Sequence, residues 1–377
     1  MPTKIEWCDE TINPVVGCAK CSPGCANCYA ERFAARLAKN PKTAERYSKV
    51  VDERGRWNGR VDIDFSCFDK LPRQPKSIFL ASMGDIFHES ISSDSLNALL
   101  TLIADRPEHQ FCLLTKRAER LAAIVGELAA YRLSVQKAEA DLLNSPSPLP
   151  SEIHHPGIQW PLKNLWLGVT VCNQEEADGK IPALLSTPAA HRFVSVEPML
   201  GRINLRPFIQ LWGDNYTEEH FEKYGWSYND FSGGFFGTGG GGDPIYDPHP
   251  GLKCVIVGGE TGPGARPMHP DWVRSLRDQC RAAAVPFFFK GWGEWGATAE
   301  NMMTGEPAFV SFESFTTYCN KARTWMRPAD ALICPDGHRP ANGAEEGKTF
   351  PMCVVRRLGC KKAGRLLDGV EHNERPW

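Results

Sequence analysis

The sequence predicts an α/β protein built on a partial or complete (β/α) barrel with a C-terminal extension. Two observations predict it: short, continuously apolar runs recur along the chain, and helical stretches separate several of them. Continuous apolar runs are typical of parallel strands that are buried on both faces, and strands alternating with helices form βα units. The alternation holds over residues 1–298 and fades over 299–377, so we place the barrel in the first range and the extension in the second.

Six apolar runs are the predicted strands, and polar or turn-forming residues follow each of them. Because the carboxyl ends of parallel strands lie at the same edge of a sheet, these polar residues are expected to meet there. An open doubly wound sheet is the alternative, and its sites would form at the same edge. The predicted strands are 77–81, 110–114, 165–171, 192–196, 254–257 and 286–289, and the predicted helices are 93–104, 117–143, 175–185 and 271–284.

A cysteine-rich segment, residues 17–31, reads GCAKCSPGCANCYAE and holds four of the fourteen cysteines. A stretch with helical spacing follows it directly, and the positive end of such a helix favours thiolates or a bound anion. Cys25 and Cys28 form C-x3-C-x2-C when combined with Cys21, or C-x6-C-x2-C when combined with Cys18. Either choice presents three thiolates on one short loop.

The spacing leaves two kinds of metal site open. Three thiolates on a four-iron cluster leave one iron free to bind a small molecule, whereas four thiolates close a structural zinc or iron–sulfur site. A thiol redox pair of Cys25 and Cys28 is a third interpretation, but it gives Cys18 and Cys21 no role. In a reducing cytosol, clustered cysteines are more often metal ligands than disulfides.

Composition narrows the possible environments and partners. The chain has 377 residues, of which 42% are hydrophobic and 23% charged, as in an ordinary globular protein. Its net charge of −2 gives no overall attraction to nucleic acid or membrane, so any such contact requires local patches. No apolar run approaches the ~18–20 residues that span a bilayer, and the N-terminal residues lack the apolar stretch of a signal peptide. We therefore expect a cytoplasmic protein that does not bind membranes.

Several further segments are distinctive. Residues 144–156 are rich in Ser and Pro and are predicted to form a loop, and the glycine-rich insertion at 233–250 is predicted to be either a lid or a surface loop. Basic residues at Lys116-Arg117 and between 356 and 365 are candidate patches for nucleic acid. The extension also holds residues whose spacing fits no common zinc site: Cys319, Cys334, His338, Cys353 and Cys360.

Five blocks of the sequence resemble the radical S-adenosylmethionine superfamily, and more narrowly a phage- and bacteria-associated branch of largely unassigned function. The blocks are IEWCDETINPVVGC, SPGCANCYAE, VGGETGPGAR, FFFKGWG and KKAGRLLDG, and they extend over most of the chain. The resemblance implies a barrel of the radical SAM type that binds a [4Fe–4S] cluster through three cysteines. S-adenosylmethionine would chelate the fourth iron and be cleaved to a 5′-deoxyadenosyl radical, with flavodoxin or ferredoxin as the reductant.

The resemblance also implies a set of ligands for the cluster. The pattern of the branch maps onto Cys18, Cys25 and Cys28, whereas the general spacing of the superfamily maps onto Cys21, Cys25 and Cys28. We favour Cys18, because the flanking Asn13-Pro14 and Gly17 match the branch, and keep Cys21 as its alternative.

Residues for S-adenosylmethionine follow from the same resemblance. Residues 254–260 look like the late-strand segment that contacts the adenine, and polar groups near the ends of two earlier strands would reach the ribose or the methionine part. The SMGD sequence at 82–85 occupies the place of the motif that binds the methionine amino group. The implied residues are Ser82, Asp85, Thr170, Asn173, Ser195, Glu197, Ile256, Gly258 and Glu260.

Two functions are therefore weighed. The first is a radical S-adenosylmethionine enzyme whose unidentified substrate is, by analogy, a nucleic acid or nucleobase derivative. The alternative is a non-catalytic iron–sulfur or zinc-binding module on a barrel scaffold with a nucleic-acid-binding role. When Cys18 is the third ligand of an open cluster, Cys21 separates the two functions, because only a closed four-cysteine site then needs Cys21.

Overall fold

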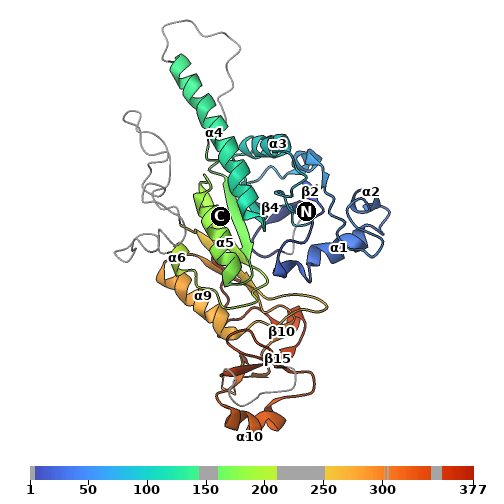
Figure 1. Cartoon of the computed structure of the whole chain (residues 1–377), viewed down its shortest axis with the longest axis vertical. Coiled ribbons are helices and arrows are strands. Elements are labelled where there is room, and N and C mark those ends of the chain that lie inside the picture. Colours follow the sequence, from blue (N-terminus) through green and yellow to red (C-terminus); the bar gives the residue numbers. More distant parts are fainter. Residues whose placement is uncertain (1–4, 144–159, 210–250, 301, 304, 341–349) are drawn as a thin grey trace.

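A single curled sheet of seven parallel strands forms the centre of the molecule. It is seen in a computed structural model that describes residues 5–143, 160–209, 251–300, 302–303, 305–340 and 350–377 (Figure 1). The strands lie in sequence order, which gives a partial (β/α) barrel and excludes the crossover order of a doubly wound sheet. They are β1 (Glu10–Ile12), β4 (Ser77–Leu80), β5 (Gln110–Thr115), β6 (Leu165–Val171), β7 (His191–Val196), β8 (Cys254–Gly258) and β9 (Phe287–Gly291).

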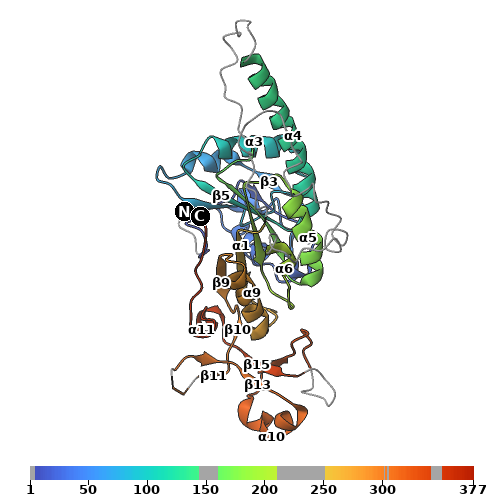
Figure 2. The same ribbon diagram turned by 90° about the vertical axis from the view of Figure 1, so that its left-hand side faces the viewer.

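Helices cover the convex face of this half-barrel (Figures 1 and 2). Their apolar sides share one core with the outward-facing strand residues, for example Leu99 and Val273 with Ile78 and Val255. Ser92 begins the first of them by accepting a hydrogen bond from the N–H of Ser95 (3.2 Å). The helices are α3 (Ser93–Ala104), α4 (Ala118–Leu143), α5 (Gln174–Ser186), α6 (Arg206–Ile209) and α9 (Pro270–Ala282).

A second apolar cluster fills the concave face of the half-barrel. One residue from each of several neighbouring strands points into it, and two tryptophans from opposite ends of the chain complete it. The indole N–H of Trp377 donates a hydrogen bond to the backbone oxygen of Trp7 (2.8 Å), so residues far apart in the sequence close this cluster together. Its buried members are Trp7, Cys8, Phe79, Cys112, Trp166, Phe193, Cys254, Ile256 and Phe288.

The segment after β1 builds the surroundings of the cysteines. It contains two short strands that pair antiparallel, two short 3₁₀ helices and two α-helices. Gly17 has a φ of +96°, and a side chain there would meet the backbone oxygen of Arg60, so the turn into the cysteines requires glycine. The elements are β2 (Val15–Val16), η1 (Pro23–Cys25), α1 (Tyr29–Leu37), α2 (Ala44–Tyr47), β3 (Asp62–Ile63) and η2 (Phe65–Lys70).

The C-terminal part adds a small antiparallel sheet beyond β9 (Figure 2). A helix packs on this sheet around Phe312, and residues 366–377 then return to the half-barrel, where the backbone N–H of Phe289 donates to the oxygen of His372 (3.0 Å). The elements are β10 (Trp295–Gly296), β11 (Ala299–Glu300), β12 (Pro307–Ala308), β13 (Val310–Phe312), α10 (Phe315–Trp325), β14 (Ala331–Ile333), β15 (Met352–Arg357) and α11 (Cys360–Ala363).

The structure confirms the six predicted strands and the four predicted helices, with boundaries that differ by at most two residues. The short first strand, β1, escaped prediction because its three residues, Glu-Thr-Ile, carry no apolar run. The loop at 144–156 and the glycine-rich insertion at 233–250 lie outside the described residues. None of the described helices combines the length and the apolar character that a bilayer crossing requires.

Candidate functional site

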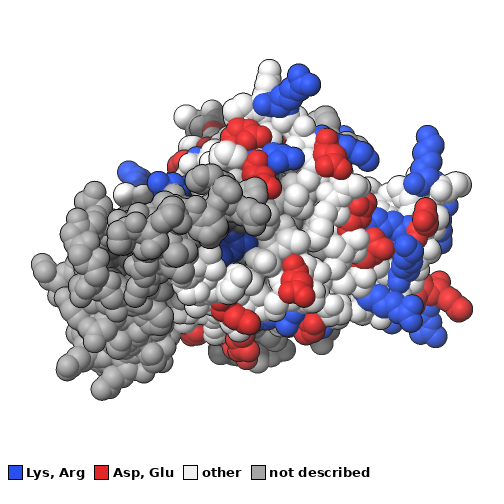
Figure 3. All heavy atoms as spheres, turned by 90° about the horizontal axis from the view of Figure 1, so that it is seen from above, with Lys and Arg blue, Asp and Glu red and all other residues white. Residues whose placement is uncertain are grey.

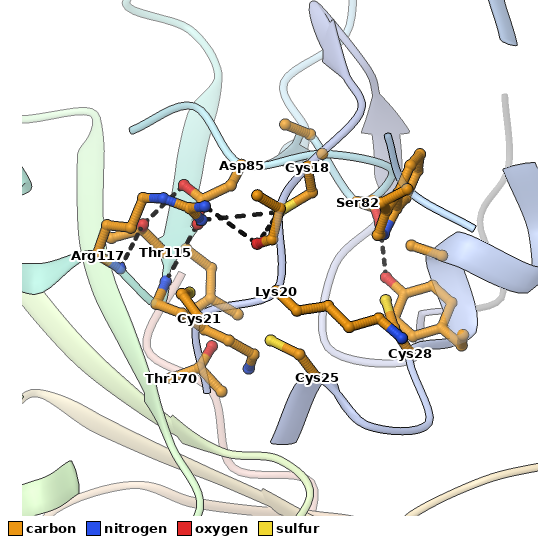
Figure 4. A pocket seen from close by; sticks show the side chains of 18 of the residues that line it. Cys18, Lys20, Cys21, Cys25, Cys28, Ser82, Asp85, Thr115, Arg117 and Thr170 are labelled. Carbon is orange, nitrogen blue, oxygen red and sulfur yellow. Dashed lines mark hydrogen bonds and ion pairs between the residues drawn. The ribbon is translucent and has the colours of Figure 1, made fainter. Parts of the chain in front are cut away.

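The four clustered cysteines line one cavity of about 140 Å³ at the carboxyl ends of β4, β5 and β6 (Figure 4). The loop that carries them forms one wall, and residues at the ends of the three strands form the other. From the loop and its surroundings come Cys18, Ala19, Lys20, Cys21, Cys25, Cys28, Tyr29, Ala30 and Trp57. From the strand ends come Phe79, Ala81, Ser82, Gly84, Asp85, Leu114, Thr115, Lys116, Arg117 and Thr170.

Local capping shapes the cysteine loop. The Ser22 hydroxyl accepts a hydrogen bond from the N–H of Gly24 (3.1 Å) and begins η1, and α1 begins directly after Cys28. The free N–H groups at the start of α1 therefore lie next to the thiols, as the sequence predicted. A side chain at position 24 would come within 3.1 Å of the Pro198 ring, so this glycine lets the loop approach the end of β7.

The thiols differ in burial and in acidity. Cys25 is buried, Cys18 and Cys28 are half-buried, and Cys21 is exposed; none of the four forms a disulfide. A hydrogen bond from the Cys21 thiol lowers the pKa of Cys25 to about 5, against burial that raises it. Burial raises the pKa of Cys18 to about 12, against the nearby Arg117 guanidinium, which lowers it. The lowered pKa favours the thiolate form of Cys25, which is the form that binds metals, whereas metal binding at Cys18 requires the release of a proton.

A buried ion pair anchors the loop to β5. Asp85 accepts hydrogen bonds from the Thr115 hydroxyl (2.7 Å) and from Arg117 (2.9 Å). The same guanidinium donates to Glu89 (2.8 Å) and to the backbone oxygen of Ala19 (3.0 Å). Its Nη1 lies 3.7 Å from Cys18 Sγ. Arg117 therefore fixes the start of the cysteine loop relative to the strand edge, and Asp85 orients Arg117.

A second ion pair anchors the other side of the loop. Glu260, which follows β8, accepts hydrogen bonds from Arg266 (2.6 and 2.8 Å) and from the Asn27 side chain (3.0 Å). Arg266 also donates to the backbone oxygen of Pro23 (3.0 Å), and Arg32 donates to that of Thr261 (2.9 Å). Burial raises the pKa of Glu260, but these donors outweigh it and hold the pKa below its usual 4.5. The VGGETGPGAR block thus clamps the cysteine loop.

The SMGD segment contacts the loop through its backbone. The Tyr29 hydroxyl donates to the backbone oxygen of Ser82 (2.8 Å), and the Ser82 hydroxyl donates to the side chain of Asn13 (3.2 Å). Ala81, at the end of β4, has a φ of +61°, which is uncommon for a residue with a side chain. A Cβ on Gly84 would lie 2.9 Å from the Val15 oxygen, so close backbone packing fixes this turn.

Further polar residues lie on the inner wall beyond the cavity, at the ends of β7 and β9. Lys290 Nζ lies 3.2 Å from Glu197 Oε1, and the Ser195 hydroxyl donates to Glu197 Oε2 (3.3 Å). A Cβ on Gly258 would come within 2.5 Å of the Glu197 carboxylate, so glycine makes room for it. The pairing of β8 with β9 shifts between Val257 and Gly258, which leaves Lys290 as the extra residue of a bulge.

The structure places the nine predicted cofactor residues in three settings. Ser82, Asp85 and Thr170 line the cavity with the thiols. Ser195, Glu197, Ile256 and Gly258 continue along the inner wall, with Ile256 fully buried in the apolar cluster. Asn173 caps α5 by accepting from the N–H of Glu176 (2.9 Å), and Glu260 clamps the loop. Their roles toward a cofactor stay predictions.

Sequence reasoning missed several residues that shape the cavity. Arg117 was expected to face nucleic acid, but its side chain is buried against Asp85, and only the structure shows this pairing. Lys20 and Glu31 form an ion pair (2.8 Å) across the loop, and Tyr29 forms part of the cavity wall. The sequence signal that could have indicated Tyr29 and Glu31 was the CYAE block, which contains both residues.

Among the described residues, no group of three or more His, Cys, Asp or Glu side chains is arranged to hold a metal ion. The same holds for the five C-terminal residues that the sequence analysis considered for zinc, Cys319, Cys334, His338, Cys353 and Cys360.

A comparison with models of protein families identifies the family. The model for DUF5131, described as a protein of unknown function, matches residues 2–376. The chain belongs to the DUF5131 family. No curated protein and no solved structure matches the chain. The DUF5131 match includes the cysteine loop and the two ion pairs that anchor it. It also includes residues 366–376 of the segment that returns to the half-barrel, but not Trp377.

Proposed function

We propose that the protein is a radical S-adenosylmethionine enzyme whose partial (β/α) barrel is of the radical SAM type. One observation carries the proposal: free thiols of a single short loop line a cavity at the carboxyl mouth of a parallel half-barrel. This is the edge where parallel α/β folds place their sites. The whole-chain resemblance to a phage- and bacteria-associated branch of that superfamily supports the same conclusion.

By donor type, three thiols of this loop would suit a [4Fe–4S] cluster. Cys25 and Cys28 lie on the cavity wall, and Cys18 lies there with Arg117 beside it. Donation to cluster sulfurs is one of the means by which proteins set the potential of such a cluster. Cys21 is the most exposed of the four, so we assign Cys18 as the third ligand and keep Cys21 as the alternative.

When bound, the cluster and S-adenosylmethionine would supply a 5′-deoxyadenosyl radical that takes hydrogen from the substrate. The role of the chain would be to bind these cofactors and to shield the radical. Phe79 and Leu114 give the cavity an apolar part of its wall, and Thr170 offers a hydroxyl to a bound cofactor. Glu197 and Lys290 extend the polar wall toward β9, where a longer ligand would reach them. Flavodoxin or ferredoxin is the proposed reductant.

The proposal is tested by loading the chain with iron and sulfide without oxygen. We expect about four irons and four sulfides per chain, because three thiolates hold one [4Fe–4S] cluster. Addition of dithionite and S-adenosylmethionine should then release 5′-deoxyadenosine and methionine. A colourless chain that retains only zinc would contradict the proposal.

The alternative is a closed four-cysteine site in a non-catalytic nucleic-acid-binding module. It is favoured by one observation: Cys21 lines the same cavity and its thiol hydrogen-bonds to Cys25. Replacement of Cys21 by Ala separates the two functions. If three thiolates suffice, one of the two variants retains the iron: Cys21→Ala when Cys18 is the third ligand, and Cys18→Ala when Cys21 is. If the site is closed, both variants lose the metal to a similar extent.

A further inference from the structure

Positive charge is concentrated in residues 32–60, the segment that follows the cysteine loop. It contains nine Lys or Arg residues and three Asp or Glu residues, a net charge of +6 within a chain whose net charge is −2. The segment includes most of α1 and all of α2. Such a local excess, in a chain that is otherwise acidic, creates an attractive field for a polyanion over one part of the surface.

Most of these cations are available to solvent. We define the basic surface as the seven exposed ones among them, and within the described part of the chain only Lys49 of these has a carboxylate within ion-pair distance, Asp62 at 3.4 Å. Figure 3 shows Lys and Arg side chains gathered at the end of the molecule where α1 and α2 lie in Figure 1. The residues of the basic surface are Arg36, Lys39, Lys42, Lys49, Arg54, Arg56 and Arg60.

The basic surface is continuous with the rim of the cavity. Trp57 lies within its segment and lines the cavity, and its N–H donates to Glu31 (3.0 Å), which pairs with Lys20 on the cysteine loop. Two aromatic rings are exposed on the same part of the chain: Tyr29, at 49%, also lines the cavity, and Phe33, at 42%, lies under the guanidinium of Arg36.

Three arginines of the basic runs that the sequence suggested for this role are held by contacts within the chain, whereas Lys361 and Lys362 of the same runs are exposed. Arg117 is buried against Asp85, and Arg356 forms a bidentate ion pair with Asp330 (2.7 Å for both bonds). Arg357 donates to the backbone oxygen of Gly262 (3.0 Å). Arg117 and Arg356 are thus paired with carboxylates, whereas six of the seven cations of the basic surface have no carboxylate within ion-pair distance among the described residues.

We propose that the basic surface binds a nucleic-acid strand and presents one of its nucleotides to the cavity. Lys and Arg neutralise phosphates without regard to sequence, and exposed rings stack on unpaired bases. The combination favours a single strand or a locally unpaired segment. An acidic protein would satisfy the charges but would leave the rings unused. As a statement about the substrate, this inference rests on the proposed radical chemistry; as a statement about binding, it does not.

The test compares two matched double variants of the whole chain. Lys39→Glu/Lys42→Glu reverses two charges of the basic surface, and Lys361→Glu/Lys362→Glu reverses two exposed charges on α11. The probes are mixed-sequence single-stranded DNA and RNA oligonucleotides of about 20 nucleotides, and the readout is fluorescence anisotropy between 50 and 200 mM salt. Iron content and the unfolding midpoint show that both variants fold like the parent chain.

We expect the first variant to bind at least about tenfold more weakly, and the salt slope to fall by about 1.4, since each contact to a single strand contributes about 0.7. The α11 variant should bind like the parent. Phe33→Ala should weaken binding without a change in salt slope, because stacking releases no counterions. Equal losses in both double variants, or no loss in either, overturn the inference. So does binding of polyglutamate as tight as that of the oligonucleotides.

Failure of this inference can be told apart from failure of the proposed function. Binding is measured for the metal-free and the cluster-loaded chain, independently of cofactor cleavage. Salt-dependent binding that is lost in Lys39→Glu/Lys42→Glu, without release of 5′-deoxyadenosine, would leave the surface in place and overturn the radical chemistry. Release of 5′-deoxyadenosine without such binding would overturn this inference alone.

Discussion

Some polar side chains at the site hold the cysteine loop in place by fixing a neighbouring arginine. Asp85 is predicted to meet the methionine part of S-adenosylmethionine, and its carboxylate also holds Arg117 while it lines the cavity. Glu260 does the same for Arg266 on the opposite side. A polar residue at a strand end can therefore contribute to a site by fixing a neighbour, and the sequence pattern alone does not distinguish that role from ligand contact.

Glycine at position 168 decides the packing of the half-barrel interior. A Cβ there would lie 2.5 Å from two ring atoms of Phe193, a buried side chain of the neighbouring strand. We expect Gly168→Ala to destabilise the protein by about 1–3 kcal/mol, because an overpacked core must shift. Chemical denaturation measures the change.

The matched control is Gly179→Ala in α5, where a Cβ meets nothing within 4 Å. Alanine loses less backbone freedom than glycine on entering a helix, so this variant should be more stable by roughly 0.5–1 kcal/mol. Equal effects of the two substitutions would show that packing against Phe193 is not the cause.

The returning segment, residues 366–377, is the element that closes the concave face of the half-barrel. The ring centroid of Trp377 lies 5.9 Å from that of Trp7, 5.0 Å from that of Trp166 and 5.6 Å from that of Phe193. Trp377→Ala should cost about 2–4 kcal/mol of unfolding free energy, because it removes a large ring from an apolar cluster.

Trp377→Phe separates ring packing from hydrogen bonding. It keeps an aromatic ring and removes the donor to Trp7, so we expect a loss of about 1 kcal/mol beyond the change in ring size. If Trp377→Ala unfolds at the same denaturant concentration as the parent, the segment does not contribute to the stability of the half-barrel.

Helices and strands could be predicted where the residues of the element itself carry the pattern. β6, with seven buried residues, and α3, with its Ser92 cap, carry their own patterns. The return of residues 366–377 carries no such pattern, because its reason is a contact with Trp7, which lies 370 residues away from Trp377. The cysteine loop was predictable from spacing, but the anchors Arg117 and Arg266 depend on tertiary contacts and were not.

At the scale of the molecule, basic side chains occur in two settings, paired with carboxylates inside the fold or exposed on the surface. Arginines that lie against the half-barrel, such as Arg117, Arg266 and Arg356, pair with carboxylates and hold segments together. Six of the seven cations of the basic surface have no such carboxylate partner among the described residues, and the proposed nucleic-acid contact rests on their positive field. The near-neutral net charge of the whole chain conceals this division, so composition alone gives no sign of the positive surface on which the proposed contact rests.

The paired carboxylates also set how the stability of the whole molecule depends on pH. Asp368 accepts hydrogen bonds from Arg274 and Arg277 (both 2.7 Å) and so ties the returning segment to α9. Burial raises the pKa of Asp368, but the two arginines outweigh it and hold the pKa below 3.8. Other carboxylates with lowered pKa values are Asp9, Asp64, Glu89, Glu176, Glu260 and Asp330.

A folded-state pKa that is lower than the unfolded one contributes stability that is fully present above the unfolded value and is lost as the pH falls through the folded one. For Asp368 this loss occurs below pH 3.8. We therefore expect the unfolding free energy to fall as the pH drops through this range, and Asp368→Asn to flatten that fall while lowering stability at pH 7. Urea denaturation from pH 7 to pH 3 measures both effects, with Glu53→Gln at an exposed carboxylate as the control. An acid profile of Asp368→Asn as steep as that of the parent would show that the two arginines do not couple the returning segment to α9.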